Sequence, residues 1–513
     1  MKYTVVSSAE FTYPDIWEYA SSSAAIDAFT ARGTYAAFQV LFGDLDAPEM
    51  EIGFEGLPEG TAAELYTLRS VMVERNQNIG EDQRQPHYPE RVAPYRLYDC
   101  LRTYDGTLDL TEGYGGVYAA IKAEKDAQPG VYECVMTANG VRIPMTLQIY
   151  AAVLPEETLT MIHGFSGGAV CKFHGVESGS PEYAALEEKY LAALRRLHNN
   201  MMYTGGIGCK KVGENQWEFD FEPFIRLVER YEKAGMKYFN APSVGWRKSW
   251  SQPTILLRGE IPSMSYEGYC YLMQYLPALK KVLDEHGWTE RFVMGVADEP
   301  NDANCTEFRA LCGLIHRIVP EIRLCDAMSY GNLHGALDVW VPLNAEYDKH
   351  QKEIETLRAG GAEIWHYVCC GPREPGYINR FMDYPLLSTH YLHWGNYRHN
   401  LTGYLHWAAN CYQPGQDPFE LNCPEHHNTD AVCYLPAGDT HLLYPGTDGP
   451  WLSIRLEAQR EGAEDYEFLK KLAETDKPKA DALCEKVFRS FRDVEYDVTV
   501  FTAVRRRLLE SLS

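Results

Sequence analysis

The sequence predicts a protein of the α/β class in three parts: an N-terminal β-sandwich, a central (β/α)8 barrel and a C-terminal helical segment. Short alternating or apolar runs fill residues 1–155, and apolar runs alternate with helical stretches over residues 156–412. Residues 413–513 begin as loops and end in helical periodicity. A chain of 513 residues has room for roughly two to four domains, so we place the domain boundaries at these three ranges.

The first region contains strand-like segments such as AAFQVLFG and EMEIGFEG, which turn residues separate. Its last two segments, VYECVMT and VRIPMTLQIYAAVLP, are joined through Asn139 and Gly140. These residue types tolerate the positive φ that a tight hairpin requires. We expect a β-sandwich that the chain leaves at residues 154–157.

The central region alternates apolar runs with longer helical segments, which is typical of βα units and a parallel sheet. The helical segments place Leu, Ile and Tyr at three- and four-residue spacing, as in PEYAALEEKYLAALRRLHNN. Eight strands in such alternation predict a (β/α)8 barrel. The candidate strands are LTMIHGF, NNMMY, KYFNA, FVMGVA, IRLCDA, DVWVPL, EIWHYV and GYLHWA.

The C-terminal region becomes helical from about Leu452, where Arg460 and Glu464 stand at the i,i+4 spacing that stabilises a helix. The sequence ends in FTAVRRRLLESL. We expect the arginines at positions 505, 506 and 507 to form a solvated helix face.

The composition argues against several classes of partner. The chain has 48 Lys and Arg against 72 Asp and Glu, and a net charge of -24 repels nucleic acids and anionic membrane surfaces. We find neither a signal peptide nor an apolar run long enough to span a membrane, so we expect a cytoplasmic protein without membrane insertion. Fourteen cysteines without short paired spacing predict reduced thiols. The sequence does not specify the oligomeric state.

The fourth candidate strand ends in two neighbouring acids, in the stretch RFVMGVADEPN. Asp298 and Glu299 would lie at its C-terminal end, on the rim where barrel enzymes place their chemistry. A structural alternative is that the acids cap the next helix, with Pro300 at its first position.

Other predicted strand ends carry aromatic and amide side chains. Aromatic walls with a few amides around paired carboxylates are typical of a sugar pocket, and the chain has 35 Tyr and 10 Trp. Each tryptophan taken alone would more often pack in the core, so the prediction depends on their convergence. The residues are Asn240 and Trp246 after the third strand, Asn344 and Glu346 after the sixth, Trp365, His366 and Tyr367 on the seventh, and Trp407 and Asn410 at the eighth.

Several stretches resemble the motif series of glycoside hydrolase family 123. The segment QPGVYECVM is similar to the end of that family's N-terminal β-sandwich, and the resemblance extends from about residue 115 to about residue 472. It is most specific over residues 403–469. The stretches are GVADEPN, EIWHYVCCGPREPGYINRFMDYP, GYLHWAANCYQPGQDP and HLLYPGTDGPWLSIRLEAQREGAEDYEFLKKL.

The resemblance implies a retaining exo-β-N-acetylgalactosaminidase that uses substrate-assisted catalysis. By motif, the family's catalytic pair falls on Asp298 and Glu299. Glu299 would be the general acid, and Asp298 would hold the 2-acetamido group of the sugar, whose carbonyl oxygen attacks the anomeric carbon. A conventional retaining enzyme needs two carboxyl groups about 5–5.5 Å apart on opposite sides of the bond, which sequence neighbours cannot easily provide. Two such close acids also repel, so one pKa should rise.

The resemblance also implies roles for further residues, which match the family by motif or by position. Trp365 and Tyr367, and also Trp407 and Asn410, are expected to bind the terminal sugar. Trp246 and Asn344 are additional candidates for that role. The helix SIRLEAQREGAEDYEFL is expected to form a structural ion network that braces the barrel through Arg455, Glu457, Arg460 and Asp465.

Three alternatives remain open. Glu346 or Asp338 could act opposite Glu299 as a conventional nucleophile or base. The segment NCPEHHNTDAVC gathers possible metal ligands at Cys423, Glu425, His426, His427 and Cys433, but it lacks HExxH and CxxC spacing, so no metal and no cofactor are predicted. A non-catalytic carbohydrate-binding protein is the third alternative, although such a protein has no need of a poised acid.

Overall fold

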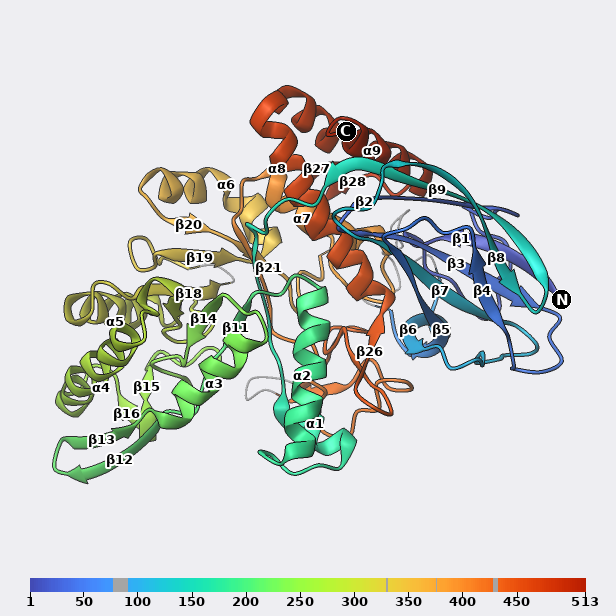
Figure 1. Cartoon of the computed structure of the whole chain (residues 1–513). Helices are drawn as coiled ribbons and strands as arrows, with labels where there is room; N and C mark the ends of the chain where they lie inside the picture. The colour runs from blue at the N-terminus through green and yellow to red at the C-terminus, as the bar shows by residue number, and fades with distance from the viewer. Residues whose placement is uncertain (77–90, 329–330, 375, 428–431) are drawn as a thin grey trace.

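The structure is a computed structural model that describes residues 1–76, 91–328, 331–374, 376–427 and 432–513. Figure 1 shows a β-rich N-terminal part on the right and a barrel with surrounding helices on the left. The long C-terminal helix α8 (Ile454–Val487) runs between them. The predicted fold class of sandwich, barrel and C-terminal helical segment is confirmed.

The N-terminal part contains two sheets within the described residues. The smaller sheet has the order β2 (Ile26–Arg32), β9 (Val141–Val153), β8 (Gly130–Ala138) and β4 (Ile52–Glu55). The larger sheet has the order β1 (Lys2–Ser7), β3 (Tyr35–Gly43), β7 (Gly115–Ala123), β5 (Thr61–Val73), β6 (Tyr95–Thr103), β26 (Pro450–Ser453) and β25 (Tyr444–Pro445).

The burial pattern explains how the two sheets are layered. Strand β8 alternates between buried and more exposed residues, as expected of a sheet with one face in water. Strand β7 is buried almost throughout because the larger sheet has the smaller sheet on one face and α8 on the other. The hairpin at Asn139 and Gly140 is present, with φ of 45° and 80°, and Ala138 pairs with Val141.

Two short strands from the C-terminal region extend the larger sheet, which the sequence did not predict. Leu452 of β26 pairs with Leu101 of β6, and Ser453 pairs with Cys100. The C-terminal region is therefore tied to the sandwich as well as to the barrel. The boundaries at residues 155 and 412 remain a proposal.

The barrel sheet is parallel throughout, and every one of the eight predicted strands is present. The seventh predicted strand is interrupted at Trp365, and its two halves pair with different neighbours. The barrel closes through this interruption. The strands are β10 (Thr160–His163), β11 (Met201–Tyr203), β14 (Tyr238–Ala241), β17 (Phe292–Met294), β18 (Arg323–Met328), β19 (Val339–Pro342), β20 (Glu363–Ile364), β21 (His366–Tyr367) and β22 (Gly403–His406).

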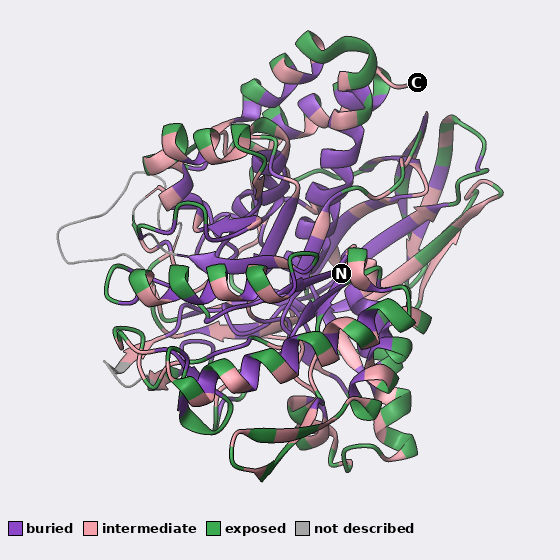
Figure 2. Ribbon diagram, turned by 90° about the vertical axis from the view of Figure 1, so that its left-hand side faces the viewer, coloured by how far each residue is buried: buried purple, intermediate pink, exposed green. Residues whose placement is uncertain are grey.

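Helices cover the outside of the barrel, and Figure 2 shows their exposed faces in green around buried strands in purple. The helical segments predicted between the strands are present as α2 (Pro181–Arg196), α3 (Glu222–Lys233), α4 (Tyr266–Glu285), α5 (Cys305–Ile318) and α6 (Asn344–Ala359), although most of their bounds differ by a few residues. Two further helices, α1 (Gly167–His174) and α7 (Leu387–Arg398), were not predicted, and α8 and α9 (Val498–Glu510) follow them. None of the helices in the described residues is both long and apolar enough to cross a membrane.

The ion network predicted on α8 is present and lies at the junction of sandwich and barrel. Arg455 and Asp99 of β6 are both fully buried and form two hydrogen bonds of 3.0 and 2.9 Å. Arg460 pairs with Glu457 at 3.1 Å and with Glu464 at 2.7 Å. Buried charges are tolerated only when they are paired and hydrogen-bonded, so this network fixes how α8 is seated between the two β structures.

The prediction of a solvated arginine face is wrong for Arg505. Its guanidinium lies 2.7 Å from a carboxylate oxygen of Glu461 and 2.8 Å from one of Asp465, and its side chain is only 12% exposed. The reason is tertiary, because α9 packs against the part of α8 that carries these buried acids. Arg507 is exposed, as expected.

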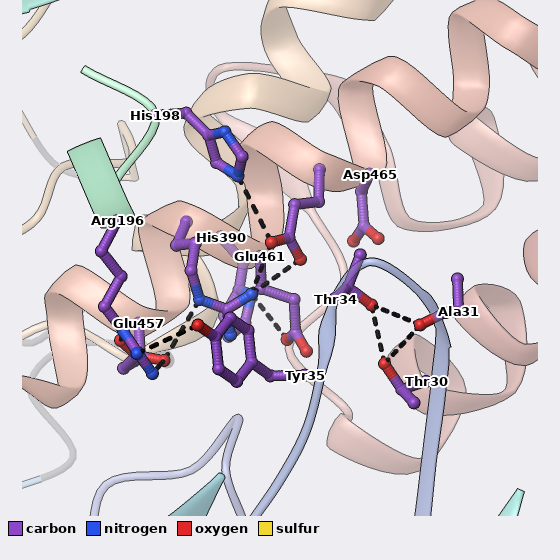
Figure 3. Close-up of polar contacts among 12 residues, drawn as sticks. Thr30, Ala31, Thr34, Tyr35, Arg196, His198, His390, Glu457, Glu461 and Asp465 are labelled. Carbon is purple, nitrogen blue, oxygen red and sulfur yellow. Dashed lines mark hydrogen bonds and ion pairs between the residues drawn. The ribbon is translucent and has the colours of Figure 1, made fainter. Parts of the chain in front are cut away.

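His198 joins α8 to the segment that links the sandwich to the barrel. Its Nδ1 lies 3.4 Å from Glu157, and its Nε2 lies 3.3 Å from Glu464. Figure 3 shows His198 above the pair formed by Arg196 and Glu457. Burial alone would lower the pKa of His198, but the hydrogen bonds to the two carboxylates outweigh it and raise this pKa to about 8. The imidazolium therefore persists at neutral pH.

We expect the contribution of His198 to stability to disappear at alkaline pH. A histidine with a raised pKa stabilises the fold below its unfolded pKa of about 6.5, and this stabilisation is lost as the pH rises through about 8. The loss is at most about 2 kcal/mol, since one pKa unit corresponds to about 1.4 kcal/mol. Urea unfolding of wild type and His198→Gln at pH 6 and pH 9 measures it. A difference between the two proteins that is the same at both pH values would contradict the prediction.

Candidate active site

Asp298 and Glu299 lie directly beyond the carboxyl end of β17, in a turn that we call the acidic turn (residues 295–299). Helix α5 begins only at Cys305, with Asn304 at its N-cap position, so the alternative that the acids cap this helix is wrong. Glu299 has a φ of 48°, in the left-handed region that non-glycine residues rarely adopt. Backbone strain of this kind is concentrated at functional sites.

A third carboxylate supports the acidic turn from below. Asp326 of β18 is buried, and its Oδ2 accepts hydrogen bonds from the backbone N–H groups of Val296 (2.9 Å) and Ala297 (3.0 Å). Burial and the charge of Asp298 raise the pKa of Asp326 to about 7, although the two N–H groups act in the opposite direction. Asp326 was not among the residues predicted for the site, because the sequence shows it only as an acid within the strand next to the acidic turn.

We expect Asp326→Asn to change how stability depends on pH. An acid whose pKa is raised from about 3.9 to about 7 binds more protons in the folded state, so it lowers stability as the pH rises through this window. The amide does not titrate there. The free energy of unfolding of Asp326→Asn relative to wild type should therefore increase from pH 4.5 to pH 8, as urea unfolding would show. A relative stability independent of pH would contradict the assigned protonation.

The matched variant Asp326→Leu tests whether Asp326 positions the acidic turn. Leucine leaves the N–H groups of Val296 and Ala297 without an acceptor, at a cost of about 1–3 kcal/mol for each group. Asparagine keeps an acceptor oxygen. We expect kcat to fall much further with leucine than with asparagine. Equal losses would show that the hydrogen bonds do not matter for the turn.

The two acids of the turn are electrostatically coupled. Burial raises the pKa of Asp298, and the positive charge of Arg247 opposes this shift. Burial and the charge of Asp298 raise the pKa of Glu299, while a 2.8 Å hydrogen bond from the Tyr367 hydroxyl to Glu299 Oε1 and the charge of Arg247 lower it. The net shift is upward for both acids, so a proton is held at this turn at higher pH than on ordinary carboxyl groups.

Asp298 and Tyr203 are both exposed to solvent at the carboxyl ends of barrel strands. Asp298 has an exposed surface, yet enough protein surrounds it to raise its pKa through desolvation. Tyr203, at the end of β11, combines 39% exposure with a strongly raised pKa, and the charge of Asp298 contributes to that rise. Both side chains are therefore at least partly exposed to solvent in a region where desolvation raises their pKa values.

Arg247 supplies the positive charge at this site, and sequence analysis did not identify it. Its Nη2 donates to the backbone carbonyls of Asp298 and Glu299, in the second case at 3.1 Å. Its Nη1 is buried and has no hydrogen-bond partner within the described residues. The guanidinium thus fixes the backbone of the acidic turn and keeps one further donor.

Two of the predicted sugar-binding aromatics reach the rim. Tyr367 contacts Glu299 directly through its hydroxyl. Trp407 follows β22, is partly exposed, and donates its indole N–H to the two carboxylate oxygens of Asp439 at 3.2 and 3.3 Å. Burial raises the pKa of Asp439 to about 6, against the effect of Arg380 and the Trp407 hydrogen bond. The Trp407 ring is held in one orientation at the edge of the site.

Three other predicted sugar-binding residues lie away from an accessible surface. Trp365 is 3% exposed, fills the barrel interior and donates to Glu363 at 2.7 Å. Asn410 is fully buried, and both polar atoms of its side chain bond the backbone of Ser166. Asn344 is also fully buried and donates to the carbonyl of Ile378 at 3.0 Å. The structure gives these three residues packing and bracing contacts, and we do not include them in the proposed sugar site.

Trp246 lies beside Arg247 and is 43% exposed. Its indole N–H donates to the carbonyl of Leu257 at 3.3 Å, and its backbone pairs with Leu256. Its accessible ring is therefore fixed close to the acidic turn.

The two alternative carboxylates are placed differently. Asp338 precedes β19 and accepts hydrogen bonds from His316 and the Leu324 N–H, so it lies at the opposite end of the barrel from Glu299. It cannot act opposite Glu299. Glu346, in the first turn of α6, lies at the carboxyl end of β19 and is paired with Lys349 at 3.1 Å. Glu346 alone remains an alternative partner.

The possible metal ligands near residue 425 do not form a recognisable site in the described residues. No group of three or more His, Cys, Asp or Glu side chains there could hold a metal ion. Residues 428–431 of this segment lie outside the described part of the chain. His426 contacts Gln413 at 3.2 Å, and Cys423 is buried against the carbonyl of Arg75.

Comparison with known proteins identifies a family model and several solved structures of similar fold. Residues 182–472 match the family model described as glycoside hydrolase 123, catalytic domain. The fold is similar to that of a family 123 glycoside hydrolase from Clostridium perfringens, with a TM-score of 0.75 and 13% identity over 100% of this chain and 98% of that chain. A β-D-glucuronidase from Dictyoglomus thermophilum matches with a TM-score of 0.36 and 8% identity, over 84% of this chain and 90% of that one. No curated protein matches the sequence.

Proposed function

Because the chain belongs to glycoside hydrolase family 123, we propose that it removes a terminal β-linked N-acetylgalactosamine from a glycan by substrate-assisted catalysis. Membership of this family makes the chain a glycoside hydrolase that acts on a carbohydrate. The published description of the similar Clostridium perfringens enzyme concerns hydrolysis of glycolipid glycans. The sugar and the mechanism are our proposal for this chain.

The observation that carries the proposal is the acidic turn. Asp298 and Glu299 are neighbours in the sequence and lie at the same place on the rim of the barrel. The pKa of each carboxyl group is raised. Two carboxyl groups from one turn cannot flank a sugar ring from opposite faces, as a conventional retaining mechanism requires. The requirement disappears when the attacking oxygen belongs to the 2-acetamido group of the substrate.

In the proposed first step, Glu299 donates its proton to the glycosidic oxygen as the bond to the anomeric carbon breaks. The acetamido carbonyl oxygen forms the new bond to that carbon from the opposite face, and Asp298 accepts a hydrogen bond from the acetamido N–H. This gives an oxazolinium intermediate and a free aglycone. The Tyr367 hydroxyl then stabilises the Glu299 carboxylate that the proton transfer leaves behind.

In the second step, a water molecule attacks the anomeric carbon and gives one proton to Glu299. The bond to the acetamido oxygen breaks, so the amide is restored and the configuration of the sugar is retained. The exposed face of Trp407 is available for packing against the apolar side of the terminal sugar.

Hydrolysis of three 4-nitrophenyl glycosides tests the proposal. We expect turnover of the β-N-acetylgalactosaminide, weaker turnover of the β-N-acetylglucosaminide and at least a thousandfold lower kcat/KM for the β-galactoside, which lacks the nucleophile. A thiazoline analogue of N-acetylgalactosamine should inhibit strongly, because it resembles the intermediate. Comparable turnover of the β-galactoside, together with weak thiazoline inhibition, would instead support a conventional pair of Glu299 and Glu346.

A further inference from the structure

Two neighbouring cysteines, Cys369 and Cys370, follow β21 at the rim of the barrel, and the proposed mechanism does not use them. Both are free thiols, and both are partly exposed. Cys369 packs against residues of the barrel interior, as does Tyr367 two positions earlier in the chain. The charge of Glu299 acts on both thiols. The pair therefore lies on the same face of the barrel as the proposed acid and close to it.

The two thiols interact with each other and differ in acidity. The Cys369 thiol donates a hydrogen bond to the Cys370 sulfur, and this bond is the largest of the effects that lower the pKa of the Cys370 thiol. The guanidinium of Arg373 acts in the same direction, whereas burial and the charges of Asp439 and Glu299 oppose it. The same hydrogen bond, together with burial, raises the pKa of Cys369. Cys370 thus forms a thiolate more readily, and the thiolate is the form that reacts with oxidants.

Hydrogen bonds to the backbone hold the two cysteines in place. Asn379 is fully buried, and its Nδ2 donates to the carbonyl of Cys369 at 3.1 Å. Arg373 Nε donates to the carbonyl of Cys370 at 2.8 Å. These bonds fix the reduced form of the loop directly after the strand that carries Tyr367.

A disulfide between the two cysteines would change this loop. The Cα atoms of neighbouring residues are about 3.8 Å apart across a trans peptide bond, whereas disulfides usually join Cα atoms about 4.4–6.8 Å apart. Closure of the ring must therefore twist the peptide that Asn379 and Arg373 hold in the reduced form. Strained and exposed disulfides are easily reduced again, and they are the ones that serve regulation.

We propose that Cys369 and Cys370 form a reversible oxidation site for hydroperoxides, and that a disulfide between them switches the hydrolase off. The inference goes beyond the proposed function, because it requires an active glycoside hydrolase but no particular sugar.

The reaction uses one peroxide molecule for each pair of thiols. The Cys370 thiolate attacks one peroxide oxygen, the O–O bond breaks, and the other oxygen leaves as water or an alcohol after it takes up a proton. Cys370 is then a sulfenic acid. The Cys369 sulfur attacks the Cys370 sulfur and displaces hydroxide, which leaves as water with the proton of the Cys369 thiol. The two thiols lose two electrons in total, and the peroxide accepts them.

The disulfide would act on catalysis through Tyr367. The twist in the loop displaces the end of β21 and, with it, the hydroxyl that donates to Glu299 Oε1 at 2.8 Å. A displacement of about 1 Å in a catalytic constellation can lower the rate about 10²-fold. Oxidation should therefore lower kcat even though neither cysteine contacts the reacting atoms.

The experiment treats the purified wild type with hydrogen peroxide and afterwards with dithiothreitol. Hydrolysis of 4-nitrophenyl β-N-acetylgalactosaminide and the mass of the peptide that contains both cysteines are measured after each step. We expect activity to fall about tenfold or more and the peptide to lose two hydrogen atoms. Dithiothreitol should restore both. If the wild type cleaves a different aryl glycoside instead, the proposed sugar is wrong, and the same measurements with that glycoside still decide the oxidation site.

Three serine variants assign the roles of the thiols. Cys370→Ser removes the attacking thiol, so its activity should survive peroxide. Cys369→Ser removes the second thiol, so a sulfenic acid should persist on Cys370 and react with dimedone. The matched control is Cys411→Ser, since Cys411 follows β22 on the same face of the barrel and is also partly exposed, but burial raises its pKa to about 11. This variant should respond to peroxide as wild type does.

Several results would overturn the proposal. The site is refuted if the peptide of the peroxide-treated wild type keeps both hydrogen atoms, or if Cys370→Ser loses activity as fast as wild type does. Resistance of Cys411→Ser to peroxide would also refute it, because the reactive thiol would then be Cys411. A disulfide that forms without loss of activity would show that oxidation of the pair does not control hydrolysis.

Discussion

Glu299→Gln is expected to lower kcat for a tetrasaccharide with β-linked N-acetylgalactosamine at its non-reducing end by about 10²–10⁴-fold, the usual contribution of a general acid. Glutamine has almost the same shape and can still accept the hydrogen bond that Tyr367 donates to Glu299 Oε1. It cannot deliver a proton to the glycosidic oxygen. KM should change little, because the lost interaction belongs to the transition state. Steady-state kinetics of the purified variant measure both constants.

The pH dependence gives a second measure of the same substitution. Burial and the charge of Asp298 raise the pKa of Glu299, so the protonated acid persists to higher pH than an ordinary glutamate. In wild type, kcat/KM should fall as the pH rises through this raised pKa. The basic limb should vanish in Glu299→Gln. A variant that keeps the limb, or that keeps full activity on the tetrasaccharide, would remove Glu299 from the role of acid.

The leaving group provides a control for general damage. A dinitrophenyl group departs without protonation, so an N-acetylgalactosaminide of this kind does not need the acid in the first step. We expect Glu299→Gln to lose much less activity on this substrate than on the tetrasaccharide. A loss of equal size on both substrates would indicate that the substitution disturbs the site in some other way.

The sequence predicted the barrel strands well because each is a short apolar run between helices of clear periodicity. It could not predict the interruption at Trp365, which depends on closure of the sheet between β19 and β22. It also missed the pairing of Leu452 with Leu101, since no local pattern encodes a partner 351 positions away. The prediction that Arg505 lies on a solvated helix face was wrong for the same reason, because its acidic partners lie on another helix.

The candidate site shows the same division between local and tertiary information. Adjacent acids after an apolar run placed Asp298 and Glu299 on the rim. Side-chain direction along the seventh strand was harder to judge, since both Trp365 and Tyr367 point into the barrel but lie at different heights. The Tyr367 side chain lies near the carboxyl ends of the strands, where its hydroxyl contacts Glu299. The Trp365 side chain lies nearer the amino ends, where its indole contacts Glu363.

Buried polar residues are the hardest to assign from sequence, and the sugar-binding roles predicted for Asn410 and Asn344 stay untested. Asn410 and Asn344 stand where a sugar-binding amide could stand, but the fold uses their amide groups to hold Ser166 and Ile378. Backbone groups that leave a regular strand need such partners. Conversely, Arg247 and Asp326 bond the backbone of the acidic turn, and neither residue belongs to a motif that sequence analysis could single out.

Asp298→Asn is expected to lower kcat by about 10²–10³-fold, the size of effect seen when one preorganised polar partner of a transition state is lost. The charge of Asp298 orients the acetamido N–H, and an amide in its place holds that group more weakly. Affinity for the thiazoline inhibitor should fall in parallel with kcat. The basic limb of the pH profile should also move to lower pH, because the charge of Asp298 contributes to the raised pKa of Glu299.

Glu346→Gln is the control variant for Asp298→Asn. If the substrate supplies the attacking oxygen, no second carboxylate attacks the anomeric carbon, so only Asp298→Asn should weaken the thiazoline inhibitor. A conventional mechanism predicts the reverse. The kcat of Glu346→Gln would fall at least a thousandfold, and Asp298→Asn would bind the thiazoline inhibitor as tightly as wild type does. A covalent glycosyl intermediate would form on Glu346. The position of Glu346, paired with Lys349 on α6, favours the first outcome, because this pairing holds its carboxylate to a neighbour on its own helix. Kinetics of both variants with the inhibitor therefore distinguish a nucleophile on the ligand from one on the protein.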